Sequence, residues 1–284
     1  MPPVGIIGLG LLGHAVASRL LAGGFEVIGY DVVGDRVADL ARLGGRGAAS
    51  AAEAGATDAV CVILPSLTSV EEVILGADGL VARGRPQQTI VQMSTISPAL
   101  ARRLHREVTA RGLCFLDCPI SGTSAMVAQG SGVVFVGGER AVFERWRAML
   151  EAVLPRPVYV GEAGQAMVLK LVANLLVALH SAAAAEALTM AKRGGLDMDL
   201  VLDVLRTGAA GSRMLDVRGP LIVKDEFPAQ MKLDLFMKDL HLIQEAAGEI
   251  GAVLPLTDVA ERLYAAVHAD GHGAEDLSVV VKAF

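Results

Sequence analysis

A lysine and an asparagine lie four residues apart in a stretch that is otherwise almost entirely apolar. Lys170 and Asn174 occur in GQAMVLKLVANLLVALHSAAAAEALTMA, residues 164 to 191. In a helix this spacing places both side chains on one face, where both can act on one small molecule. A buried ammonium group is costly unless it is paired or neutralised. Lys170 therefore either extends its long side chain to water or exchanges protons with a bound molecule.

A glycine-rich segment near the N-terminus is a second candidate site. Within VGIIGLGLLGHAVASRLL the glycines have the spacing G-x-G-x-x-G. This pattern is weak alone, but here it follows an apolar run of strand length and opens a helix, as dinucleotide-binding folds require. The helix N-terminus would face the pyrophosphate. The predicted cofactor-binding residues of this loop are Gly8, Leu9, Gly10, Leu11, Leu12 and Gly13.

An acidic residue ends the next expected strand. Asp31 closes the segment EVIGYD and lies 18 residues after Gly13. A carboxylate at this position accepts hydrogen bonds from the adenosine ribose and repels a 2′-phosphate. The residues directly after it, VVGD, include no arginine, and Arg36 lies further on. We therefore expect NAD as the cofactor, with NADP disfavoured by Asp31.

The elements that must position these residues alternate between strands and helices. In the segment SPALARRLHREVTARG, Ser97 is the expected N-cap, Pro98 the first helical residue and Gly112 the end of the helix. The alternation predicts an α/β Rossmann-type domain with a mainly parallel sheet and helices on both faces. The expected strands are Val4–Leu9, Glu26–Tyr30, Ala59–Leu64, Thr89–Gln92, Cys114–Cys118 and Val133–Val136.

The pattern changes after the segment PRPVYVGEAG. From Gln165 onwards we find only helical segments, separated by RGGLD, TGAAGS and DGHG. The sequence thus predicts an NAD-binding Rossmann-like domain at residues 1–161. An all-helical domain at residues 162–284, joined by a long interdomain helix, would serve substrate binding and oligomerisation.

The composition excludes several classes of protein. The 284 residues are 53% hydrophobic and 20% charged, which indicates a large core and excludes extensive disorder. A net charge of −6 and only 4% aromatic residues argue against binding to nucleic acid. The start MPPVGIIGLG lacks the basic region of a signal peptide, and three cysteines fit a reducing compartment. We therefore expect a cytoplasmic protein.

The apolar stretch at 171–191 is long enough to raise the question of a membrane span. His180, Ser181 and Glu186 lie inside it, and aromatic or basic belts do not flank it on both sides. We expect no membrane span but a helix buried on most of its circumference, in a homodimer or homotetramer. No metal site is predicted, because only His268 and His272 are close in sequence and Gly271, where we expect a helix to end, lies between them.

Four segments, in this order, resemble motifs of the β-hydroxyacid dehydrogenase family, which includes 3-hydroxyisobutyrate dehydrogenases, tartronate semialdehyde reductases and threonate dehydrogenases. The segments GLGLLG, DCPISGTSAMVAQG, GQAMVLKLVAN and FMKDL are similar to the family's cofactor, substrate, catalytic and late K-D-L motifs. The resemblance covers the whole chain. It implies an enzyme that moves a hydride between a nicotinamide and a small anionic β-hydroxy acid or its oxidised form.

The resemblance also implies roles for individual residues. Lys170 would be the general acid/base, and Asn174 would hold the substrate or orient the lysine. Loss of water around such a lysine disfavours its charged form and lowers its pKa toward working pH. The other implied contacts are Ser121, Gly122 and Thr123 to the substrate carboxylate, Lys238 to nicotinamide and substrate, and Leu64, Pro65 and Thr95 to the cofactor ribose. Asp239 is a candidate ion-pair partner of Lys238, of little energetic value if exposed.

The chain departs from the family pattern at three positions. Leu12 replaces a methionine, Ala166 a glycine of the catalytic motif, and Thr123 the second glycine of S-G-G. Thr123 adds bulk and a hydroxyl beside the carboxylate, so it bears on the choice of substrate, and the C-terminal segments look closest to the tartronate semialdehyde and threonate branches. Two alternatives remain. A non-catalytic dinucleotide-binding scaffold would tolerate loss of the lysine, and an imine reductase would carry an acid or tyrosine in its place.

Overall fold

The chain forms two compact units, which the computed structural model describes over residues 2–284. The first unit is Met1–Lys170 and the second is Leu171–Phe284. The division falls inside one continuous helix, α9 (Gln165–Arg193), nine residues beyond the boundary expected after residue 161. The first turn of α9 therefore belongs with the sheet of the first unit.

The first unit is built on a nine-stranded sheet in which β1 lies between β2 and β4. The strand order is β3-β2-β1-β4-β5-β6-β8-β7, and β9 pairs with β8. Strands β1 to β6 run parallel, whereas β8 is antiparallel to β6 and β7. This sheet confirms the predicted α/β fold class. The bounds are β1 Val4–Ile7, β2 Val27–Tyr30, β3 Arg46–Gly47, β4 Ala59–Val62, β5 Thr89–Gln92, β6 Cys114–Asp117, β7 Ile120–Ser121, β8 Val133–Gly138 and β9 Val158–Gly161.

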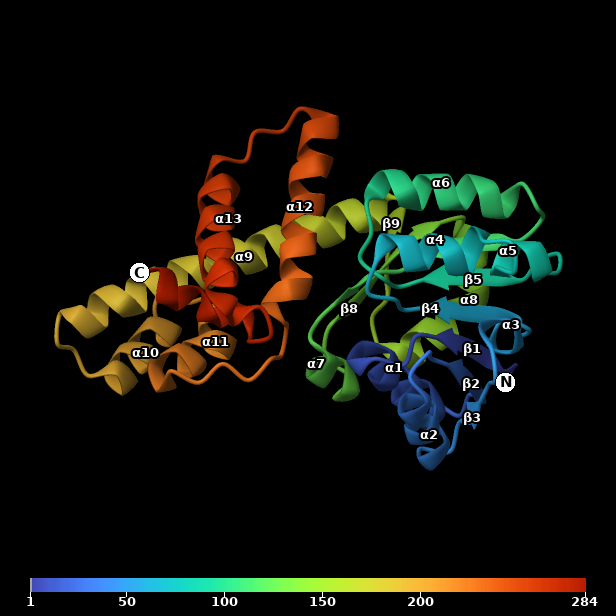
Figure 1. Ribbon diagram of the computed structural model, residues 1–284, viewed down its shortest axis with the longest axis horizontal. Helices are drawn as coiled ribbons and strands as arrows, with labels where there is room; N and C mark the ends of the chain where they lie inside the picture. The colour runs from blue at the N-terminus through green and yellow to red at the C-terminus, as the bar shows by residue number, and fades with distance from the viewer. Residues whose placement is uncertain (1) are drawn as a thin grey trace. The chain divides into compact units, whose positions relative to one another are not determined.

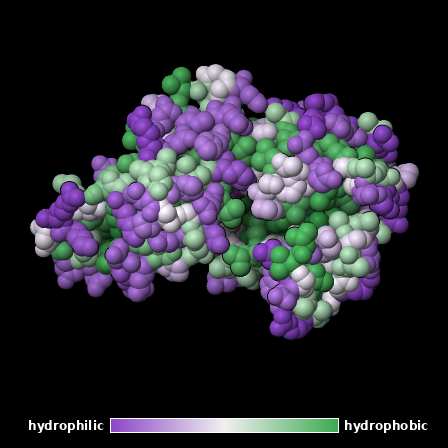
Figure 2. All heavy atoms as spheres, viewed as in Figure 1, coloured by the Kyte–Doolittle hydropathy of each residue, from purple (hydrophilic) through white to green (hydrophobic). Residues whose placement is uncertain are grey.

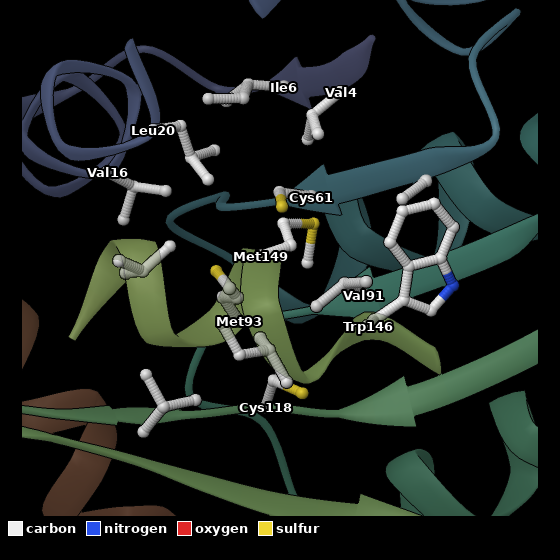
Figure 3. Packing of buried hydrophobic residues seen from close by; sticks show 14 of the residues in the cluster. Val4, Ile6, Val16, Leu20, Cys61, Val91, Met93, Cys118, Trp146 and Met149 are labelled. Carbon is white, nitrogen blue, oxygen red and sulfur yellow. The ribbon is translucent and has the colours of Figure 1, made fainter. Parts of the chain in front are cut away.

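Helices cover both faces of this sheet, because alternate strand residues point to opposite sides. Ile6 belongs to the buried cluster beneath α1 and α8, and Ile7 to the cluster beneath α4 and α6 (Figure 1). Figure 3 shows the first cluster, where the sulfur atoms of Cys61, Met149 and Cys118 lie among apolar side chains. The helices are α1 Leu11–Ala22, α2 Gly34–Arg42, α3 Ala51–Ala54, α4 Leu67–Leu75, α5 Leu80–Arg83, α6 Pro98–Thr109, α7 Ser124–Ala128 and α8 Arg140–Val153.

The six expected strands are all present, with ends that shift by at most two residues. The helix α6 begins as expected, since the Oγ of Ser97 accepts a hydrogen bond from the N–H of Leu100 at 3.1 Å and Pro98 is the first helical residue. Strands β3, β7 and β9 were not expected. The first two contain two residues each, too short for any alternation to mark them, and β9 is partly exposed.

The second unit is helical over the residues that the structure describes, apart from one isolated β-bridge between Lys232 and Asp276. Asp276 is fully buried and accepts hydrogen bonds from the side chain of Arg218 and from three backbone N–H groups. A buried carboxylate needs such partners to offset its loss of water. The elements are α10 Met198–Thr207, α11 Arg213–Lys224, α12 Leu233–Ile250, α13 Pro255–Val267, a π-helical turn at His268–His272 and a 3₁₀ helix at Leu277–Ala283.

Helix α9 is buried on one side within the chain and exposed on another. By length and composition it is the one described helix able to cross a membrane, a test that core helices of soluble proteins also pass. Lys170, Asn174 and Ser181 lie on its buried side, whereas Val172 and Leu176 are exposed by 48% and 46%. Within the single chain, one side of the helix is therefore buried and carries Lys170 and Asn174, while apolar side chains remain exposed on another side. Burial of these exposed residues in a homo-oligomer stays a prediction.

The N-terminus of α9 is held by a side chain from the sheet. Asp117, the last residue of β6, is fully buried and its Oδ2 accepts hydrogen bonds from the N–H groups of Gly164 at 3.0 Å and Met167 at 3.2 Å. Burial raises the pKa of Asp117 to about 7, and the two hydrogen bonds oppose this rise. Loss of water therefore outweighs the stabilisation of the charged form.

A raised pKa makes a signed prediction about stability. Between its unfolded value near 3.8 and its folded value of about 7, Asp117 binds more protons in the folded state than in the unfolded state. The stability that it contributes is complete below pH 3.8 and is lost as pH rises through 7. We expect the unfolding free energy of wild type, minus that of Asp117→Asn, to fall by about 4 kcal/mol between pH 4 and pH 7.5. Denaturant unfolding of both proteins at several pH values measures this difference in unfolding free energy. A difference that grows with pH would show that the two hydrogen bonds to the carboxylate outweigh its loss of water.

Candidate active site

The glycine-rich loop after β1 has the geometry of a pyrophosphate cradle. Gly8 has φ of +97°, and a Cβ there would lie 2.0 Å from the carbonyl oxygen of Ile63. A Cβ on Gly13 would lie 1.9 Å from the carbonyl oxygen of Gly8, so the helix α1 packs directly on the loop. Both positions are therefore restricted to glycine by the fold itself.

Gly10 differs from its neighbours because the chain leaves open space around it. A Cβ on Gly10 would meet no described atom within 4 Å, and no described side chain caps the N-terminus of α1. The first turn of α1 carries no acidic residue. Free N–H groups at a helix N-terminus attract a phosphate. The loop therefore fits a dinucleotide pyrophosphate, and Gly10 leaves the room that such a group needs.

Asp31 at the end of β2 is fixed beside this loop. Its Oδ2 accepts a hydrogen bond from the N–H of Leu9 at 2.7 Å, and its Oδ1 accepts one from Val33 at 2.9 Å. The guanidinium of Arg36 in α2 lies 3.3 Å from both carboxylate oxygens. Arg36, which the sequence analysis set aside as too distant, thus pairs with Asp31 and partly neutralises it.

The surface around this carboxylate is apolar, as an adenine ring would require. Leu11, Val32 and Val33 are exposed by 71%, 87% and 42%. Figure 2 shows apolar residues gathered over the first unit between α1 and α4. A carboxylate suited to the ribose of an adenosine and apolar side chains suited to its adenine ring therefore lie next to each other.

The loops after β4 and β5 are joined at the same edge of the sheet. The N–H of Leu64 donates a hydrogen bond to the Oγ of Ser94 at 2.8 Å, which brings Leu64 and Pro65 toward the loop that contains Thr95. The strand order places β1 between β2 and β4, so the chain reverses its direction of winding at β1. Ligands of open α/β sheets bind at the carboxyl ends of the strands at such a point. Ser94 is a contributor that the sequence analysis did not identify.

The segment expected to bind the substrate carboxylate follows β6. Ser121 ends β7, Gly122 has φ of +154°, and Thr123 is the N-cap of α7. The Oγ1 of Thr123 accepts a hydrogen bond from the N–H of Met126 at 3.2 Å, so its hydroxyl hydrogen remains available to a ligand. All three residues are partly exposed. Thr123 thus has a structural use as a cap besides any contact with substrate.

Lys170 and Asn174 lie one turn apart on the buried side of α9, as the sequence predicts. Their exposures are 6% and 4%, which excludes the interpretation that Lys170 simply extends into water. The Nδ2 of Asn174 donates a hydrogen bond to the Oδ2 of Asp239 at 2.8 Å. Asn174 is therefore held in one orientation by a carboxylate from α12.

Asp239 connects Asn174 to a second lysine. Its Oδ1 lies 3.0 Å from the Nζ of Lys238, and Asp239 is only 3% exposed. An exposed pair would be of little value, but the carboxylate of Asp239 is buried and bridges two predicted site residues. The adjacent Lys and Asp in FMKDL indicated an ion pair, but only the structure shows that Asp239 also contacts Asn174.

The predicted residues thus form three connected groups. In the first group, Asp31 is hydrogen-bonded to Leu9 of the glycine loop. In the second, Leu64 is hydrogen-bonded to Ser94, which precedes Thr95. In the third, Asp239 contacts both Asn174 and Lys238.

Cys118, beside the substrate segment, is fully buried, and burial raises the pKa of its thiol well above the usual value. It is therefore a core residue and a poor nucleophile.

Comparison with known families assigns both halves of the chain. Residues 3–161 match the NAD binding domain of 6-phosphogluconate dehydrogenase. Residues 163–284 match the NAD-binding domain of NADP-dependent 3-hydroxyisobutyrate dehydrogenase. Together the two matches extend over almost the whole chain.

Characterised relatives align over the full length. An L-threonate dehydrogenase from Cupriavidus necator is 33% identical over 99% of this chain and 95% of its own. An NAD-dependent L-serine dehydrogenase from Pseudomonas aeruginosa is also 33% identical, over 100% of this chain and 98% of its own. The similarity is therefore not confined to the cofactor-binding unit.

Solved structures agree with these relatives. A 3-hydroxyisobutyrate dehydrogenase from Salmonella typhimurium has a TM-score of 0.91 and 33% identity, covering 99% of both chains. An imine reductase from Myxococcus stipitatus solved with NADP+ has a TM-score of 0.67 at 19% identity, which shows a shared fold alone. The chain therefore belongs to the β-hydroxyacid dehydrogenase family, whose members use NAD(P) as their cofactor.

Proposed function

We propose that this protein is an NAD-dependent dehydrogenase of a small anionic β-hydroxy acid, with Lys170 as the general acid/base. The observation that carries the proposal is a lysine buried to 6% exposure on an apolar helix, one turn from a buried asparagine. Strongly buried lysines are rare, and a buried lysine at a ligand site is a candidate for proton transfer. The chemistry of the family requires such a group, because a hydroxyl must lose its proton as it is oxidised.

The chain would divide the reaction among its own residues. The nicotinamide, when bound, supplies the acceptor or donor of the hydride. The Nζ of neutral Lys170 takes the hydroxyl proton during oxidation and returns it during reduction. Asn174, held by Asp239, offers its side-chain oxygen to the substrate or to the Lys170 ammonium. Because Asp239 fixes the amide, this oxygen needs little reorganisation during the reaction.

Recognition of the substrate carboxylate falls to the segment after β6. The hydroxyls of Ser121 and Thr123 and the backbone of Gly122 are partly exposed donors suited to a carboxylate. The hydroxyl of Thr123, where the family motif has glycine, would favour an acid that carries a further polar group. Substrates of the threonate and glycerate type therefore fit better than 3-hydroxyisobutyrate, and the names of two relatives point the same way.

The preference for NAD is part of the proposal. Asp31 lies where the adenosine ribose is expected and would repel a 2′-phosphate. Arg36 weakens this repulsion because it neutralises part of the carboxylate charge. We therefore expect a preference for NAD rather than strict exclusion of NADP.

Self-association in the cytoplasm is also proposed. Val168, Val172 and Leu176 follow one another at four-residue spacing on α9 and are exposed by 38%, 48% and 46%. A row of exposed apolar side chains on one helix favours burial against another surface. This supports a homodimer or homotetramer.

The proposed role of Thr123 makes a prediction about the substrate. Purified protein should reduce NAD with threonate, glycerate or L-serine at a kcat/KM at least tenfold above that with 3-hydroxyisobutyrate or 3-hydroxypropionate, because Thr123 offers an extra hydrogen bond to a polar substrate. Absorbance of NADH gives the rates. Thr123→Gly should narrow this ratio. Absence of turnover across the panel, with NADH still bound, would contradict the assigned reaction.

The ion pair between Arg36 and Asp31 makes a prediction about the cofactor. The ratio of kcat/KM for NAD to that for NADP should exceed ten in wild type, and Arg36→Ala should raise it further, roughly threefold to tenfold, because no positive charge then offsets the repulsion between Asp31 and the 2′-phosphate. Asp31→Ser should lower the ratio. Arg42→Ala, on the same helix but paired with Asp39, is the matched control and should leave the ratio unchanged. A fall of the ratio in Arg36→Ala would refute this role.

A further inference from the structure

We propose that Asp117 is a positioning residue, which fixes the first turn of α9 and thereby the place of Lys170 relative to the substrate-binding segment. The inference rests on the proposed function in one respect, namely that Lys170 is the acid/base. The contact itself is independent of that function. All of the residues that carry the argument belong to the first unit.

Asp117 acts as the cap that α9 lacks locally. The residue before the helix is Gly164, which has no side chain to accept the free N–H groups of the first turn. The Oδ2 of Asp117 accepts hydrogen bonds from the N–H of Gly164 at 3.0 Å and from that of Met167 at 3.2 Å. In a capping box two side chains close to the helix satisfy the N–H groups of these same two positions. Here one carboxylate, 47 residues away in sequence, satisfies both.

The start of α9 is also packed too closely to shift without cost. A Cβ on Gly137 in β8 would lie 3.3 Å from the Cβ of Ala166, and one on Gly164 would lie 2.8 Å from the side chain of Arg102. Ala166 and Met167 are fully buried. The first turn thus lies against β8 and α6 while Asp117 holds its N–H groups. The hydrogen bonds and the packing therefore both oppose a shift of this first turn along the helix axis.

The same residue ends the strand that leads into the substrate-binding segment. Asp117 is the last residue of β6, which pairs with β5 and β8, and Ser121 follows four residues later. Lys170 follows Met167 by three residues, about 4.5 Å along the helix axis and on the same face. One side chain therefore connects the end of β6, which leads into the segment with Ser121, to the turn that presents Lys170. A loss of this connection would change the distance between acid/base and carboxylate site, to which reaction rates are very sensitive.

The test compares Asp117→Ala, Asp117→Ser and Asp117→Asn in the full-length protein. Asparagine keeps an oxygen that can accept both N–H groups, serine keeps a shorter acceptor, and alanine keeps none. Three quantities are measured: hydrogen–deuterium exchange of residues 162–170, the rate at which acetic anhydride modifies Lys170, and kcat and KM for the best hydroxy acid. The first two need no substrate, so they test the contact even if the proposed reaction is wrong.

We expect Asp117→Ala to accelerate exchange in the first turn of α9, to raise the modification rate of Lys170 several-fold and to lower kcat about a hundredfold with KM within threefold. Asp117→Asn should restore exchange and modification to wild-type values and kcat to within about fivefold. The exchange rate, modification rate and kcat of Asp117→Ser should lie between those of the other two variants. This variant replaces Asp117→Ala if the latter does not fold.

A matched control separates this role from general loss of stability. Asp197 caps α10 by accepting hydrogen bonds from two N–H groups, at 3.0 and 3.1 Å, and lies on another helix. Asp197→Ala should lower the melting temperature and leave Lys170 modification and kcat unchanged. Wild-type exchange and modification in Asp117→Ala would overturn the proposal, as would equal damage in Asp117→Ala and Asp117→Asn. If exchange and modification change as expected but wild type oxidises no hydroxy acid, the positioning role stands and the proposed function fails.

Discussion

The central physical constraint on this structure is that burying the ammonium group of Lys170 in an apolar helix is unfavourable unless its surroundings compensate. Lys170 is buried on α9, and such a group persists only where its surroundings offset the loss of water. The rest of the helix is apolar enough to serve as a core element, so Lys170 and Asn174 stand out chemically. The first unit then has two tasks: to hold the first turn of this helix, and to place the cofactor and carboxylate segments at one edge of its sheet.

The sheet performs the second task through its strand ends. Parallel strands β1, β4, β5 and β6 finish at one edge, so the glycine loop and the loops that follow β4, β5 and β6 lie in sequence along that edge. Polar cross-links fix these loops to one another, as Asp31 does for the glycine loop and Ser94 for Leu64. Loops fixed to a rigid sheet can carry precise chemistry although they are irregular.

The fold class and most of the candidate site could be predicted from the sequence because their signals are local. Six strands are visible as apolar runs, and the glycine spacing is tied to one strand–turn–helix unit. What could not be predicted depends on contacts between distant residues. Nothing near Arg36 shows that its side chain turns back to Asp31, and nothing near Asp239 shows that it reaches Asn174 across 65 residues. Asp117 belongs to a recognisable motif, yet its contact with α9 spans 47 residues and has no sequence pattern.

The measurement that tests the account most directly is the single-turnover rate of hydride transfer in Lys170→Met, with NADH affinity measured in parallel. Methionine resembles the apolar stem of lysine, lacks its terminal nitrogen and cannot exchange a proton. We predict a rate about a thousandfold below wild type, within the hundredfold to ten-thousandfold range for loss of a general acid/base, with NADH binding unchanged. Lys192→Met, on the exposed end of the same helix, should retain the wild-type rate. A Lys170→Met rate within tenfold of wild type would contradict the assigned role of the buried lysine.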